Sequence, residues 1–438
     1  MRKPLILIEL NEINFDLVAR YIEAGARLPT FAKLIADKPV RCTSEQTYEL
    51  LEPWIQWVSI HTGLTYSEHR VFRLGDIVES PSEQLFEILE RAGYSVGAVS
   101  PMNAANRLVR PAYFIPDPWT STPSDPSAMS RVMATALAQT VNDNAQAKIS
   151  ASSIAAILFA LARCAPLRHY PRYGRLVWNA IRKRWQRAMF LDLLLHDIHQ
   201  RLFARHRPDF STLFLNAGAH IQHHYMLNST ALALAPITRN PSWYVPADVD
   251  PVFELLALYD ALLGEIIEDD SIEYIIATGL TQKPYDQVKY YYRLKNHGAF
   301  LDALGIAYRD VHARMTRDFL IEFENEASAQ RAEGELASIV ASADNLPIFG
   351  NIDNRGDSLF VTLTYPREIS ETASITFAGR QIGLHEFVAF VAIKNGMHDA
   401  ICYVCASEGL EGLLPRDGMH VTSIFSTIQS YFGSGCEQ

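Results

Sequence analysis

The feature that most constrains the possible fold is a short apolar run near the start of the chain. Residues 5–8 are continuously apolar, which is typical of a strand buried on both faces of a parallel sheet. The run gives way to Glu9, Asn11 and Glu12, and Asn14 can then cap a helix. Open α/β sheets place their sites where such a strand ends in polar residues. We therefore expect Glu9, Asn11 and Glu12 at a site, with ordinary loop residues as the alternative.

The length and the cysteine content of the chain limit the possible number of domains and disulfides. The chain has 438 residues, enough for one large α/β domain with insertions or for two to three smaller domains. Five cysteines argue against a disulfide framework. Cys402 and Cys405 have the spacing of a redox or zinc pair, but they lie in an apolar run without a second pair, so we expect buried strand thiols. The N-terminal apolar run is too short for a signal peptide, which predicts a cytoplasmic protein.

The first 100 residues alternate between strand and helix patterns, as in a parallel sheet with crossover helices. The serine, proline and glutamate of residues 80–83 predict a helix start. Residues 101–126 and the tyrosine-rich stretch after residue 282 are predicted to be loops. Further strands are predicted at residues 40–43, 94–100, 210–215, 274–278 and 401–406. The fold class is therefore α/β, with a mainly parallel sheet sandwiched by helices.

Residues 127–206 are predicted to be mostly helical and carry a local positive charge. Nine basic residues and no acidic residue lie between Asp143 and Asp192, although the net charge of the whole chain is −10. An apolar stretch at the short limit for a membrane span precedes arginines that alternate with tyrosine and tryptophan. Residues 149–187 thus fit docking on an anionic membrane surface, or else a cap whose arginines face a polyanionic substrate or solvent. No nucleic-acid-binding motif accompanies them, so nucleic acid is not an expected partner.

Histidines follow the strand predicted at residues 210–215. His220, His223 and His224 lie within five residues, and His220 and His224 would share one face of a helix, a workable metal spacing. His398 precedes the strand at 401–406, and His297 lies in a polar segment at residues 295–298.

The order of these landmarks resembles the alkaline phosphatase superfamily, particularly its phosphodiesterase and nucleotide pyrophosphatase branch. The matching segments are residues 5–18, 57–69, 85–100, 207–223 and 396–409. The resemblance implies an alkaline phosphatase-like core formed by residues 1–126, 207–281 and 396–438. It also implies a helical, basic insertion at 127–206 and a small α+β cap subdomain at 282–395.

That family works with two metal ions and a serine or threonine nucleophile, and this chain departs from the pattern. The aspartate of the first strand falls on Asn11, and the nucleophile falls on or beside Pro53, next to Glu52. A further carboxylate falls on Ala219, and the Asp-His pair falls within residues 279–281. Only His223 and His398 match expected ligands, which predicts that the scaffold is kept and the standard two-metal reaction is not.

We therefore expect a divergent hydrolase or transferase that acts on a phosphorylated, sulfated or glycan substrate. The substrate would be a small or lipid-linked anion, and the cofactor a divalent metal such as zinc or manganese. The alternative is a non-catalytic binding or scaffold protein on the same fold, associated with a membrane surface. The candidate residues are Glu9, Asn11, Glu12 and Glu52 for catalysis, His223, His398 and His220 for metal, and Trp57, His224 and His297 for substrate.

Overall fold

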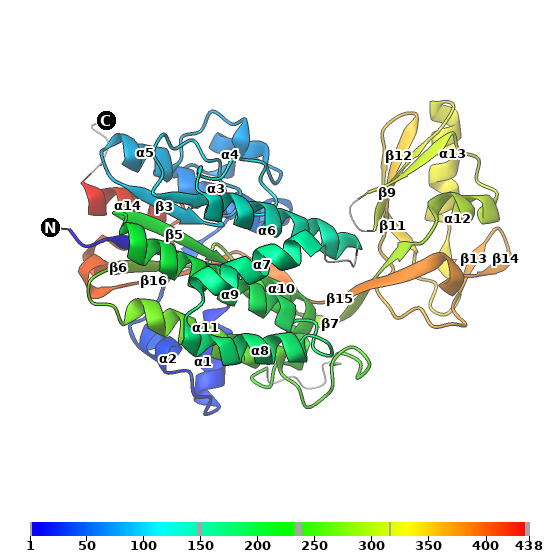
Figure 1. Ribbon diagram of the computed structural model, residues 1–438. Coiled ribbons are helices and arrows are strands. Elements are labelled where there is room, and N and C mark those ends of the chain that lie inside the picture. The colour runs from blue at the N-terminus through cyan, green and yellow to red at the C-terminus, as the bar shows by residue number, and fades with distance from the viewer. Residues whose placement is uncertain (1, 147–150, 233–238, 315–316, 434–438) are drawn as a thin grey trace. The chain divides into compact units, whose positions relative to one another are not determined.

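The computed structural model describes residues 2–146, 151–232, 239–314 and 317–433 (Figure 1). The chain divides into two compact units. The first unit comprises Met1–Leu234, Asp248–Pro284 and Gly396–Gln438, and the second comprises Ala235–Ala247 and Tyr285–Asn395.

A seven-stranded sheet forms the centre of the first unit, in the order β2-β16-β6-β1-β5-β3-β4. β1 pairs in parallel with β5 and β6, β3 pairs in parallel with β5 and β4, and β16 is antiparallel to β6 and β2. The strands are β1 (Leu5–Leu10), β2 (Val40–Thr43), β3 (Val96–Val99), β4 (Tyr113–Ile115), β5 (Phe210–Leu215), β6 (Glu273–Ala277) and β16 (Ile401–Ala406). The prediction of a mainly parallel α/β sheet is therefore confirmed.

Helices cover both faces of this sheet (Figure 1). α3 (Pro53–Thr62), α5 (Leu85–Arg91) and α14 (Ser423–Phe432) pack on one face, where Trp57, Phe86 and Phe432 share a core with apolar side chains of β1 and β5. On the other face α9 (Gln186–His206) packs against β3 and β5, with α10 (Ala217–Tyr225) and α11 (Pro251–Ile267) beside it. α1 (Phe15–Glu23) and α2 (Pro29–Ala36) follow β1, and α2 packs on α11.

The basic segment folds into helices of the first unit. α6 (Ala128–Gln146) packs on α7 (Ala151–Cys164), and α8 (Tyr170–Asn179) packs on α9. None of the helices in the described parts of the chain is long and apolar enough to cross a membrane.

The second unit is built on antiparallel sheets. One sheet contains β11 (Phe349–Asn354), β12 (Ser358–Leu363), β9 (Asp318–Glu322) and β8 (Asp310–Ala313), and the other contains β10 (Val340–Ala341), β13 (Ser374–Phe377) and β14 (Arg380–Gly383). α12 (His297–Leu304) and α13 (Glu326–Ala337) contribute to a common apolar core with them. Two of the boundaries between the units lie in β7 (Thr281–Leu294) and β15 (Val388–Asp399), which pair with each other.

Three local predictions were wrong. Residues 113–115 form β4 and residues 281–294 form β7, although both were predicted as loops. Each strand gains its hydrogen bonds from a partner elsewhere in the chain, β3 and β15 respectively, which a local pattern does not reveal. α5 begins at Leu85 instead of residue 80, because Gln84 and Glu87 form the capping box.

The prediction for the paired cysteines was confirmed. Cys402 and Cys405 are buried free thiols of β16. Burial raises the pKa of Cys402 to about 11, so its thiol stays protonated and behaves as an apolar side chain.

Candidate metal centre

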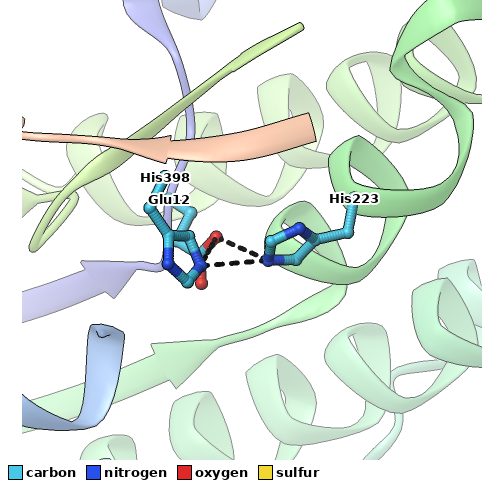
Figure 2. A group of neighbouring side chains, drawn as sticks. All are labelled: Glu12, His223 and His398. Atoms are coloured by element: carbon cyan, nitrogen blue, oxygen red, sulfur yellow. Dashed lines mark hydrogen bonds and ion pairs between the residues drawn. The ribbon is translucent and has the colours of Figure 1, made fainter. Parts of the chain in front are cut away.

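Three segments far apart in the sequence bring Glu12, His223 and His398 together (Figure 2). Glu12 follows β1, His223 lies on α10 directly after β5, and His398 lies at the end of β15. β1 and β5 are parallel, so their carboxyl ends share one edge of the sheet. β16 runs antiparallel, so its amino end lies at that same edge, and His398 immediately precedes it.

The donor atoms of the three side chains form a nearly equilateral triangle. His223 Nε2 lies 3.1 Å from His398 Nε2, and Glu12 Oε2 lies 3.2 Å from the former and 3.4 Å from the latter. Tetrahedral zinc with bonds of about 2.0 Å has ligand–ligand edges of about 3.3 Å. Two imidazole nitrogens and one carboxylate oxygen are also a donor set suited to zinc or another transition metal. The residues therefore fit the divalent cation that the resemblance implies.

Glu12 keeps its negative charge despite deep burial. Its side chain is 2% exposed. Burial opposes ionisation, but the neighbouring His398 and His223 hold the pKa of Glu12 well below its usual range. Asn11 Nδ2 donates to Oε1 at 3.3 Å, and Gln282 Nε2 donates to Oε2. The carboxylate is thus ionised and oriented at neutral pH.

The backbone of Glu12 adopts a left-handed conformation. Its φ is +62°, which non-glycine residues rarely adopt. Its N–H donates to the carbonyl of Thr278 at 3.0 Å, and its carbonyl accepts from Gln222 Nε2 at 2.7 Å. Strained conformations of this kind cluster at functional sites, where the surrounding structure holds them in place.

Contacts behind the histidines set their orientation. His223 Nδ1 lies 3.1 Å from the carbonyl oxygen of Gly396, and because a carbonyl can only accept, Nδ1 carries a proton and Nε2 is the nitrogen that a cation would take. His398 Nδ1 lies 3.7 Å from Glu52 Oε2. A carbonyl behind a metal-binding histidine commonly fixes the ring, as Gly396 does for His223, whereas the Glu52 contact is longer than a hydrogen bond.

Asn11 connects this site to the core. Its Oδ1 accepts a 2.8 Å hydrogen bond from Trp57 Nε1, and its Nδ2 also donates to Asn216 Oδ1 at 2.8 Å. Trp57 has no exposed surface, so the structure places it behind Asn11. The indole and both amides together hold the segment that presents Glu12.

The helix that carries His223 is held at its start by Asp192 of α9. The Asp192 carboxylate accepts from the backbone N–H groups of Ala217 at 2.7 Å and Asn216 at 3.3 Å. Burial raises the pKa of Asp192 to about 6. This carboxylate supplies the cap that α10 lacks from its own Asn216.

The remaining predicted site residues lie outside the triangle. Glu9 is fully buried and pairs with His61 Nε2 at 3.0 Å and with the Thr212 hydroxyl. His220 is exposed, and its ring lies 4.8 Å from that of His224. His297 belongs to the second unit, where its ring lies 4.8 Å from that of Phe319.

Sequence reasoning missed four residues that support the triangle: Asn216, Gln222, Gln282 and Gly396. Gln222 lies within the histidine-rich segment, and Gln282 follows a predicted strand end, so position could have pointed to both. Gly396 gives no signal in the sequence. A Cβ added there would lie 2.1 Å from Gln282 Oε1 and 2.9 Å from the Gln222 carbonyl oxygen, so only glycine fits.

Fold and site together define an α/β protein with a histidine–carboxylate cluster at the carboxyl edge of a mainly parallel sheet. No protein-family model and no curated protein matches the chain. Several solved structures are similar to the chain at low sequence identity. The phosphonoacetate hydrolase from Sinorhizobium meliloti 1021, in complex with phosphonoformate, is 12% identical, with a TM-score of 0.45 over 98% of this chain and 96% of that chain.

Two further solved structures are similar at a comparable level. Murine ectonucleotide pyrophosphatase/phosphodiesterase 5, an inactive variant in complex with AMP, is 10% identical, with a TM-score of 0.44 over 99% of this chain and 95% of that chain. The alkaline phosphatase from the Antarctic bacterium TAB5 is 8% identical, with a TM-score of 0.39 over 100% of both chains.

Proposed function

We propose that the protein is a metal-dependent hydrolase of small anionic esters, with Glu12, His223 and His398 as its metal ligands. The triangle of donor atoms carries this proposal, because its sides of 3.1, 3.2 and 3.4 Å match a single transition-metal site. Phosphorylated, sulfated and glycan-linked anions are the substrate classes, and zinc or manganese is the cofactor.

A bound divalent cation would polarise a substrate oxygen and lower the pKa of water. Glu12 supplies negative charge, and the two histidines supply neutral donors. Glu52, at the N-terminal end of α3 and with its side chain 32% exposed, lies on the Nδ1 side of His398, so it would accept a proton from the attacking water through a bridging water. The N-terminus of α3 favours an anionic group near it.

Metal content and hydrolysis test the proposal together. We expect His223→Ala to lose one equivalent of zinc or manganese by mass spectrometry, and to hydrolyse phosphomonoester, phosphodiester or sulfate-ester chromogenic substrates at least a hundredfold more slowly. Glu52→Gln should keep the metal and lower kcat. His206→Ala, on the exposed end of α9, is the control. Metal binding without hydrolysis of any ester would favour the binding-protein alternative, and no metal bound at this site would overturn the proposal.

The basic segment favours a second function, docking on an anionic membrane. Large apolar side chains of this segment face solvent: Leu167 is 86% exposed, Trp178 77% and Ile181 75%. Exposed Arg175 and Arg182 lie beside them on α8 and the turn that follows it. Apolar and aromatic side chains flanked by arginines match the interface of an anionic bilayer in both polarity and charge.

Vesicle co-sedimentation tests this surface. We expect binding to phosphatidylcholine vesicles that contain phosphatidylserine, weakened by salt and abolished by Trp178→Ser with Ile181→Ser. Val109→Ser removes an apolar side chain that is 82% exposed outside the segment and should bind like the wild type. Equal binding to neutral vesicles, or no effect of the double substitution, would remove the membrane function.

A further inference from the structure

A second cluster of ionisable side chains lies in the helical layer of the first unit. His169 ends the short helix η3 (Leu167–His169), His196 and Asp197 lie on α9, and Glu265 lies on α11. Both histidines and Asp197 are at most 2% exposed. The proposed metal centre uses none of these residues.

Asp197 orients both histidines from behind. One of its oxygens, Oδ1, lies 2.7 Å from His169 Nδ1 and 3.3 Å from His196 Nδ1, and Oδ2 accepts from the Tyr173 hydroxyl at 2.7 Å. Asp197 accepts a hydrogen bond from each Nδ1, and each Nε2 lies on the other side of its ring, where that of His169 contacts Glu265 Oε1. A carboxylate behind a histidine is the arrangement that prepares imidazole as a metal ligand.

Both Nε2 atoms face Glu265. His169 Nε2 lies 2.8 Å from Glu265 Oε1, and His196 Nε2 lies 4.0 Å from Oε2. One ligand atom from each of His169, His196 and Glu265 lies within 4.8 Å of the others. Two imidazole nitrogens and one carboxylate oxygen thus converge, the same donor set as at Glu12.

His196 Nε2 is the unexplained atom of this cluster. It is buried and has no hydrogen-bond partner within the described part of the chain. A buried polar atom without a partner costs about 1–3 kcal/mol, and most such atoms have one. A cation between the two histidines and Glu265 would give this nitrogen its partner.

Charge balance shows what a cation would replace. Asp197 and Glu265 are two carboxylates, and Arg168 Nη2 donates to Glu265 Oε2 at 2.8 Å. Hydrogen bonds to Asp197 and Glu265 raise the pKa of His169 to about 9, so without a cation its ring is protonated and balances the cluster. A cation would take the place of the proton on His169 Nε2.

We propose that His169, His196 and Glu265 form a second divalent-cation site, with zinc as the preferred ion and Asp197 as the residue that positions both histidines. The ion joins η3, α9 and α11, so the site serves the stability of the helical layer. Three protein donors leave the fourth position of a tetrahedral ion to water.

Zinc stoichiometry of the full chain tests the site independently of the proposed function. His223→Ala with His398→Ala removes the first centre and should leave one zinc equivalent. Adding His196→Ala should remove that equivalent, whereas adding His206→Ala, a substitution on the same helix, should not. If the first centre binds no metal, the wild type should bind one equivalent of zinc, and the single substitution His196→Ala should remove it.

Thermal unfolding provides the second readout, with Glu265→Gln as a variant that preserves side-chain shape. Zinc should raise the unfolding midpoint of the His223→Ala/His398→Ala protein, and EDTA should reverse the effect. Glu265→Gln in that background should abolish the response to zinc. Absence of zinc from the folded double variant, or a response to zinc that survives Glu265→Gln, would overturn the second site and leave a proton-linked ion-pair network.

Discussion

Trp57 Nε1 donates a 2.8 Å hydrogen bond to Asn11 Oδ1, and the amide of Asn11 in turn donates to Glu12. A fully buried indole of α3 is therefore linked through Asn11 to the carboxylate of the candidate metal centre. We expect this support to contribute to metal affinity in addition to the three ligands.

Replacing Trp57 with phenylalanine tests this support. Trp57→Phe removes the N–H group that donates to Asn11, so Asn11 no longer holds Glu12 in a fixed orientation. We therefore expect metal affinity to fall about ten- to a hundredfold. Competition with a chromogenic chelator measures the change. Trp54→Phe is the matched control, since Trp54 lies on the same helix and donates to the carbonyl of Phe72 instead. Equal affinity in both variants would contradict the role of Trp57.

The left-handed backbone of Glu12 predicts a difference between two substitutions. Glu12→Gly and Glu12→Ala both remove the carboxylate, and both should lose the metal. Alanine alone retains a Cβ that clashes at a φ of +62°, so the glycine variant should be more stable by about 1–2 kcal/mol. Urea unfolding of the metal-free proteins measures the difference, and equal stabilities would show that the backbone relaxes.

Close packing at Gly396 predicts a local steric effect. Gly396→Ala places a Cβ 2.1 Å from Gln282 Oε1 and 2.9 Å from the backbone carbonyl oxygen of Gln222, and the side-chain amides of these two glutamines donate to Glu12. We expect a loss of about 1–3 kcal/mol in the free energy of unfolding, together with weaker metal binding. Gly412→Ala is the control, because a Cβ there has no neighbour within 4 Å.

His199 predicts acid sensitivity of the fold. Burial lowers the pKa of His199 to about 3, and its Nε2 pairs with Ser211 Oγ at 2.9 Å. Between the ordinary histidine pKa and pH 3 the unfolded chain binds a proton that the folded chain does not, so stability is complete above about pH 6.5 and falls as the pH decreases. His199 contributes a slope of up to about 1.4 kcal/mol per pH unit.

Urea unfolding across this pH range measures the slope. His199→Gln removes the titrating ring and should flatten the curve by up to that amount. His206→Gln, at the exposed end of the same helix, should keep the wild-type slope. An unchanged slope in His199→Gln would show that other groups cause the acid sensitivity.

Much of the sheet could be predicted, because its strands are apolar runs that end in polar residues. The predicted strands at residues 40–43, 210–215 and 401–406 match β2, β5 and β16. β4 and β7 were not predicted, because their pairing partners come from other parts of the chain. Among the site residues, the positions of Asn11, Glu12 and the histidines were visible as polar side chains at strand ends, whereas Gly396 and the support from Trp57 were not.

By itself the sequence determined the buried strands and the polar residues at their ends, because burial on both faces requires apolar runs and a site requires polar side chains. Only the tertiary structure decided that His223 and His398, 175 residues apart, meet at Glu12 while His220 points to solvent. These residues meet because β1 pairs in parallel with β5 and β16 runs in the opposite direction. The carboxyl ends of β1 and β5 and the amino end of β16 therefore lie at one edge of the sheet.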